Sequence, residues 1–259
     1  MLVILNADDF GSSPDTVRAT IECFEQGALT SATIMPGMPA TEAALEFARR
    51  RPELSFGVHL TLTGDGQERP LAGAEAVPGL TRADGSLLPT RTVRLRALAR
   101  RLPQAQVERE LAAQIELVRA AGVAISHVDS HRHLHKLPAI RDALARVLPR
   151  FGIRRVRNVQ DVYLRRPLTS PTFWLGPLWR RQLIGRFRTT SHFYMPTSTS
   201  DTSWHGPLLE RSASLNGSLE VGVHPGFEEA WRNEERLSLL AFAQLARERG
   251  DQLAGWSSA

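Results

Sequence analysis

The sequence has almost no cysteine and almost no lysine. Cys23 is the only cysteine among 259 residues, so no disulfide can form within the chain, and a reducing compartment fits best. Lys136 is the only lysine, so arginine supplies nearly all the positive charge behind a formal net charge of +5. A surface built to bind nucleic acid commonly uses both basic residues, whereas this arginine bias is more typical of genome composition. We therefore expect no nucleic-acid partner.

Long apolar runs and a leader sequence are also missing. No apolar stretch approaches the length needed to span a bilayer, and the N-terminus has neither the basic nor the apolar region of a secretory signal. These absences predict a cytoplasmic protein. The length and a hydrophobic content of 42% suit one large α/β domain with a sizeable core, so we expect residues 1–259 to form a single domain.

The chain alternates short apolar runs with amphipathic helical patterns. Residues 1–5 run without alternation into Asn6-Ala7-Asp8-Asp9-Phe10-Gly11, which is typical of a buried parallel strand that ends in a turn. This alternation predicts a parallel sheet, either open or closed into a barrel. Further strands are predicted at 31–35, 54–62, 123–128, 153–156 and 219–223, and helices after Ser13 and Thr41, around 107–118 and 137–148, and over about 234–249.

Two segments break the alternation. Residues 63–88 show no periodicity, and a stretch of that length in a compact domain is usually a functional loop or lid. An insertion at about 160–205 holds seven of the 17 aromatic residues between 163 and 194, interleaved with arginines. Its aromatic rings could form one wall of a saccharide cleft, rest on an anionic membrane as a peripheral contact, or pack in the fold or in a homodimer interface.

Acidic and histidine side chains accompany four of the predicted strands. Asp8 and Asp9 follow the first, His59 lies in the third, His131 follows the fourth, and His224 follows the strand at 219–223. Since parallel strands end at one rim, these side chains can meet there. Each alone has an ordinary explanation, such as a turn for the paired acids. Together, a carboxylate and two imidazoles with an open position outline a catalytic metal site.

Such a site suits amide hydrolysis. A divalent ion would activate water and polarise a carbonyl oxygen, a second carboxylate would take the water's proton, and His224 could protonate the leaving amine. Two other classes stay open. A metal-dependent phosphoester hydrolase would need a second metal or several cationic contacts, and only Arg132 is close in sequence. A non-catalytic sugar-binding barrel would keep the fold without turnover.

Four motifs, in order along the chain, resemble the YdjC-like carbohydrate deacetylases, a family that includes the chito-oligosaccharide deacetylases. They are NADDFG at 6–11, GVHL at 57–60, HVDSHRHLH at 127–135 and VGVHPGF at 221–227. The resemblance covers most of the chain, and 160–205 matches least. It implies a distorted (β/α) barrel of the polysaccharide-deacetylase-like kind. It also implies metal-dependent hydrolysis of an N-acetyl group on an N-acetylated amino sugar or a glycoconjugate such as a glycolipid, releasing acetate.

The resemblance also implies roles for individual residues. Asp9, His59 and His131 would hold one divalent metal ion, Asp8 would be the general base and His224 the general acid. For His133 and His135, in the histidine-rich loop, we expect roles either in supporting the ligands or in contacting substrate, and Arg132 beside them is a further candidate substrate contact. The family is usually described with magnesium, whereas two imidazoles and a carboxylate favour zinc or another transition metal. The sugar and its linkage stay open, because the variable segments 63–88 and 160–205 would set them.

Overall fold

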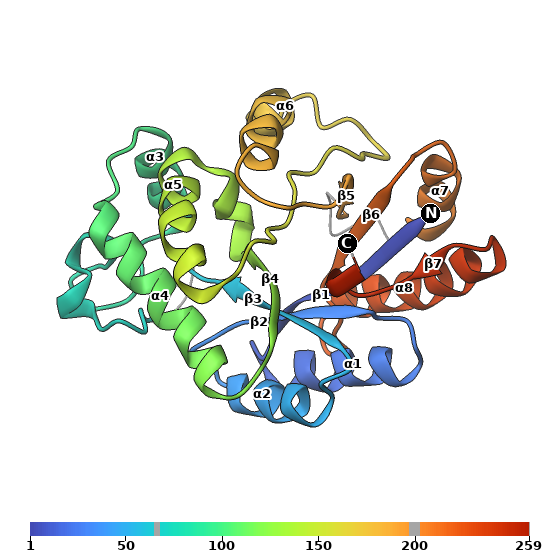
Figure 1. Ribbon diagram of the computed structural model, residues 1–259, viewed down its shortest axis with the longest axis horizontal. Helices are drawn as coiled ribbons and strands as arrows, with labels where there is room; N and C mark the ends of the chain where they lie inside the picture. The colour runs from blue at the N-terminus through green and yellow to red at the C-terminus, as the bar shows by residue number, and fades with distance from the viewer. Residues whose placement is uncertain (65–67, 197–202, 259) are drawn as a thin grey trace.

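One parallel sheet organises the molecule, and Figure 1 shows its helices arranged around the outside. The computed structural model describes residues 1–64, 68–196 and 203–258. Within them the strand order is β4-β3-β2-β1-β6-β5, with β7 also paired to β1. The sheet curls, as expected for a distorted (β/α) barrel. The strands are β1 (Leu2–Phe10), β2 (Ser31–Ile34), β3 (Ser55–Leu60), β4 (Ile125–Ser130), β5 (His192–Tyr194), β6 (Ser218–Val223) and β7 (Gln252–Leu253).

The central strand β1 is longer than the sequence suggests. Residues 3–5 are fully buried, because neighbouring strands and helices cover both faces, and this explains the unbroken apolar run. The strand continues to Phe10, so both aspartates lie inside it rather than in a following turn. Its pairing with β2 loses register between Ala7 and Phe10. The carboxyl end of β1 is therefore irregular where the two acids sit.

The helices mostly begin where the sequence predicts. Ser13 caps the first helix and accepts a hydrogen bond from the backbone of Thr16, whose side chain bonds back to Ser13. Three helices were not predicted, at Thr90–Leu98, Pro171–Ile184 and His205–Ser212, and the last helix begins at Ala230 rather than near 234. The helices are α1 (Pro14–Glu25), α2 (Thr41–Arg50), α3 (Thr90–Leu98), α4 (Gln104–Ala120), α5 (Pro138–Val147), α6 (Pro171–Ile184), α7 (His205–Ser212) and α8 (Ala230–Glu248).

Three predicted segments need correction. The described part of 63–88 is not structureless, since it holds short 3-10 turns at Ala74–Ala76 and Pro78–Leu80. No strand forms at 153–156, because this segment makes only isolated bridges, Val128 with Val156 and Arg155 with Arg188. The described part of the insertion supplies α6, which lies apart from the other helices in Figure 1, and β5, which pairs with β6. Residues 197–202 of the insertion lie outside the described residues.

An aromatic cluster fixes β1 against its neighbours. Phe10 lies with its ring centroid 6.2 Å from that of Phe56 on β3, and both contact Phe47 on α2. Phe24 on α1 completes the group at 5.7 Å from Phe56. These rings pack the carboxyl end of β1 and the amino end of β3 against α1 and α2. In the described part of the chain, no helix is both long and apolar enough to cross a membrane.

Candidate metal centre

Asp8 and Asp9 reach the same cavity although they are neighbours in a strand. Successive side chains of a regular strand point to opposite faces. Here the register break coincides with a left-handed backbone at Asp9, whose φ is 58°, a conformation that few non-glycine residues adopt. Both carboxylates line a cavity of about 360 Å³ at the rim of the sheet. Local strain of this kind is concentrated at functional sites.

Three of the predicted ligands meet at one point. The Asp9 Oδ1 atom lies 3.4 Å from His59 Nε2 and 3.2 Å from His131 Nδ1. One donor atom from each of the three side chains lies within 4.8 Å of the others, close enough to share an ion. Two imidazole nitrogens and a carboxylate oxygen are a donor set that binds divalent metals. The residues therefore fit the metal that the sequence implies.

Asp129, at the end of β4, orients His59. Its Oδ1 accepts a hydrogen bond from His59 Nδ1 at 2.8 Å, which leaves Nε2 directed toward Asp9. A carboxylate behind a metal-binding imidazole fixes the ring and strengthens it as a ligand. Burial alone would lower the pKa of His59, but Asp129 and then Asp9 outweigh it and raise the pKa to about 10. A metal would therefore have to displace a proton here.

Arg157 connects Asp8 to Asp129. The guanidinium is fully buried and donates to both oxygens of Asp8, at 2.6 and 2.7 Å. Its Nη1 lies 2.5 Å from Asp129 Oδ2, and its Nε donates to Glu220 at 2.8 Å. Burial alone would raise the pKa of Asp8, but Arg157 holds it well below the usual range. Asp8 is therefore an ionised carboxylate at neutral pH.

His224 faces the same cavity from the opposite side of β1. Its Nδ1 lies 3.2 Å from Glu235 Oε2, which also accepts the backbone N–H of His224 at 2.8 Å. The ring packs edge-on against Trp231. Burial alone would lower the pKa of His224, but Glu235 outweighs it and raises the pKa. A histidine whose pKa is raised in this way holds its proton to higher pH than a free one and can act as an acid.

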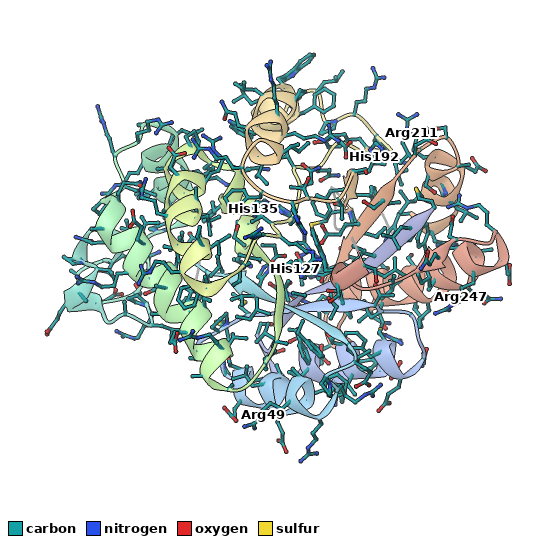
Figure 2. The ribbon with its side chains drawn as sticks, viewed as in Figure 1. Arg49, His127, His135, His192, Arg211 and Arg247 are labelled. Atoms are coloured by element: carbon teal, nitrogen blue, oxygen red, sulfur yellow. The ribbon has the colours of Figure 1, made fainter. Side chains whose placement is uncertain are left out.

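The other predicted contacts separate into two groups. Arg132 and His133 line the cavity, and both have left-handed backbone angles, with φ of 56° and 53°. His133 Nε2 lies 3.1 Å from Met195 Sδ. His135, labelled in Figure 2, is fully buried, with Nδ1 2.9 Å from Ser130 Oγ. It lines an adjoining cavity instead. Its substrate contact stays a prediction.

Sequence reasoning missed the residues that support the centre. Asp129 lies inside the motif at 127–135, two residues before a proposed ligand, so its position was a usable signal. Arg157 directly follows the segment expected to be a strand at 153–156, but Arg154 and Arg155 precede it closely, so the sequence does not single it out. Arg232, which donates to Asp9 Oδ2 at 2.9 Å, and Glu235 come from α8 and carry no signal in the sequence.

A second group of donors does not make a second metal site. Asp8, His59 and Asp129 are also close enough to share an ion. However, Arg157 holds both oxygens of Asp8 and one of Asp129, whose other oxygen accepts from His59. His59 also belongs to the first group. Among the described residues, only the first group is therefore free to hold an ion, with Arg157 behind it, which argues against a two-metal phosphoester hydrolase.

Comparison with known proteins agrees with this geometry. A family model for YdjC-like proteins matches residues 2–254. A carbohydrate deacetylase of Listeria monocytogenes serotype 4b is 32% identical over 229 residues, which cover 88% of this chain and 82% of that protein. A carbohydrate deacetylase of Geobacillus stearothermophilus is 38% identical over 169 residues, covering 65% of this chain and 63%, less than two thirds, of the relative.

Two solved structures share the fold. A protein from Enterococcus faecalis, provisionally described as a cellobiose-phosphate cleavage protein, has a TM-score of 0.78 and 26% identity, covering 99% of this chain and 98% of that one. A lactam utilization protein from Thermus thermophilus has a TM-score of 0.59 and 13% identity, covering 98% and 99%. The second likeness concerns the fold alone.

Proposed function

This chain belongs to the YdjC-like family, and on that premise we propose that it is a metal-dependent carbohydrate N-deacetylase. The reaction is hydrolysis of the N-acetyl group of an amino sugar or glycoconjugate, with release of acetate. One observation carries the proposal: Asp9, His59 and His131 surround a single point, with Asp8 and His224 facing the same cavity. The relatives named carbohydrate deacetylases support the substrate class.

Asp9, His59 and His131 would hold the ion. When bound there, a divalent cation supplies Lewis-acid polarisation of the amide carbonyl and lowers the pKa of water. Two imidazoles and one carboxylate favour zinc or another transition metal over magnesium, which prefers a shell of oxygen ligands. Asp129 keeps His59 in the tautomer that can act as a ligand. We propose zinc before magnesium.

Asp8 would act as general base. Its carboxylate is ionised because Arg157 pairs with it, and it lines the cavity beside Asp9. A carboxylate in that position can take a proton from attacking water as the carbonyl carbon becomes tetrahedral. Asn6 donates a further hydrogen bond to Asp8 Oδ1 at 2.9 Å, so the side chain is held from two sides.

His224 would act as general acid. Glu235 raises its pKa against the effect of burial, so the ring carries a proton that it can give to the leaving amine. An amine is a poor leaving group unless it is protonated as the C–N bond breaks. Arg132, His133 and His135 would contact the substrate, the first two from within the metal cavity. We also propose that the protein works in the cytoplasm and that residues 1–259 form one domain.

Acetate release tests the function. Metal-stripped protein would be given zinc, magnesium or no metal and assayed on N-acetylated saccharides, chito-oligosaccharides and glycolipids. We expect metal-dependent acetate release, with kcat lowered by about 10²–10⁴-fold in Asp8→Asn. Asp142→Asn is the matched control, because Asp142 pairs with Arg100 and Arg186 far from the cavity. Release of phosphate from phosphoesters, without acetate from any amide, would refute the proposal.

A further inference from the structure

Exposed apolar side chains gather at one end of the molecule. The described residues expose eight large hydrophobic side chains, and all but Leu237 lie on α3 or in the segment 168–184. Trp174 is 65% exposed and Leu178 52%, although both would gain from burial. Clustering of this kind marks a surface that contacts something other than water. The seven are Leu95, Leu98, Leu168, Trp174, Leu175, Leu178 and Ile184.

A cavity of about 550 Å³ lies between α3 and α6. Leu98 of α3 and Leu175 of α6 both line it. It adjoins the metal cavity, since Arg94, Arg132 and His133 line both. A molecule held at the metal centre can therefore extend directly between α3 and α6.

The cavity is basic and holds unused hydrogen-bonding capacity. Lys136, the only lysine, lines it with Nζ 5.8 Å from the centre of the Trp179 ring, and no carboxylate of the described residues forms an ion pair with it. Burial lowers the pKa of Lys136 to about 8, so it is mostly charged at neutral pH. The buried His135 Nε2 atom has no hydrogen-bond partner. This lining suits an anionic group.

The two segments that carry these apolar side chains are rich in arginine, although Asp142 pairs with Arg100 and Arg186 and Asp161 with Arg180. Residues 89–101 contain five arginines and residues 162–190 contain six, with no acidic residue in either stretch. A second cavity, of about 680 Å³, lies beside α6, and Trp174 and Arg181 line it together with Arg211 of α7. Apolar side chains among arginines match the interface of an anionic bilayer.

We propose that the amino sugar acted on by this protein is carried on a lipid through a phosphate, and that α3 and α6 rest on the membrane that bears it. The proposal depends on the proposed function and specifies its substrate class. The phosphate would lie beside Lys136 and His135 Nε2, and the lipid chain would leave over Leu175 and Leu178. The sugar would then project into the metal cavity.

Two other occupants fit less well. A free sugar phosphate would use the basic cavity but would leave Trp174 and Leu178 uncovered. A second copy of the chain would cover the apolar side chains but would bring arginine against arginine, since neither stretch contains an acid. An anionic lipid surface satisfies both features at once.

Vesicle sedimentation tests the membrane contact. We expect the protein to bind vesicles of phosphatidylcholine with phosphatidylglycerol more tightly than phosphatidylcholine alone, at about 0.15 M salt. Trp174→Ser combined with Leu178→Ser should lower binding by about tenfold or more. Leu237→Ser, which changes the exposed leucine outside the cluster, is the matched control and should bind as the parent does. Equal binding by all three proteins, or no binding, would overturn the proposal, as would a stable dimer disrupted by the double variant.

Paired substrates test the cavity. N-acetylglucosamine phosphodiesters of a long-chain alcohol and of methanol would be compared with the neutral long-chain glycoside. We expect kcat/KM to be highest for the long-chain phosphodiester. Lys136→Gln should lower the ratio of kcat/KM for the long-chain phosphodiester to kcat/KM for the neutral glycoside by about tenfold, and Lys136→Arg should restore this ratio. Equal kcat/KM for all three would overturn the lipid proposal and leave the deacetylase standing. Vesicle binding with no acetate from any substrate would overturn the deacetylase instead.

Discussion

Replacing Asp129 with asparagine should weaken metal binding without removing any ligand. Asp129 accepts the Nδ1–H of His59 at 2.8 Å, and both side chains are at most 2% exposed, so no water can take over this contact. Asparagine is nearly the same shape but is uncharged. It therefore orients the imidazole less firmly and makes it a poorer ligand.

The size of the effect follows from known carboxylate–histidine–metal contacts. Loss of such a partner typically lowers metal affinity by about 10–100-fold, which corresponds to about 1.4–2.7 kcal/mol. The same change removes one carboxylate from Arg157, so we also expect a loss of about 1–3 kcal/mol in the free energy of unfolding. The two effects must be measured separately.

Glu220→Gln provides the matched control. Glu220 also pairs with Arg157, through Nε at 2.8 Å, but it is not a partner of His59. Burial raises the pKa of Glu220 to about 7, so this carboxyl group is already partly uncharged near neutral pH in the parent protein. Zinc affinity would be measured by competition with a chromophoric chelator, and stability by urea unfolding. We expect a large loss of affinity in Asp129→Asn and a small one in Glu220→Gln. Equal losses in both would refute the orienting role of Asp129.

Three further predictions concern the same rim. Glu235→Gln removes the charge that raises the pKa of His224. The alkaline limb of the pH profile of kcat, where the acid loses its proton, should therefore move to lower pH. An unmoved limb would exclude His224 as the acid. Because His59 must lose a proton to bind metal and its pKa in the metal-stripped protein is about 10, zinc affinity should rise about tenfold between pH 7 and pH 8, and a flat titration would contradict this. Gly57→Ala places a Cβ 2.6 Å from His127 Cε1 and should cost about 1–3 kcal/mol in urea unfolding, whereas an unchanged midpoint would show that β3 yields easily there.

The sequence predicts the strand ends better than the network behind them. The unbroken apolar run before Asp8 and the strand-helix alternation are enough to bring Asp9, His59 and His131 to one rim. Ligand residues are recognisable because few other roles need a histidine at such a position. In contrast, Arg157 lies in a run of arginines, and nothing in its local sequence distinguishes a buried guanidinium from its exposed neighbour Arg154.

Long-range partners are the least predictable part of the site. Glu235 contacts His224 only because α8 begins at Ala230 and turns that face toward the end of β6. The position of α6 depends on packing against distant elements rather than on its own periodicity, since Pro177 lies within it. Residues 71 and 72 likewise are held by Glu110 on α4, whose carboxylate accepts the backbone N–H groups of Leu71 and Ala72.

The buried Arg157 gives the site a property that no separate pair of residues would have. Its Nη1 contacts Asp8 and Asp129 together, so the proposed base and the carboxylate that orients His59 share one cation. A buried charge left without its partner is strongly unfavourable. The guanidinium therefore holds both carboxylates in place at the same time. Because they share this partner, changes at Asp8 and at Asp129 cannot be independent, and the base and the metal ligands behave as one unit.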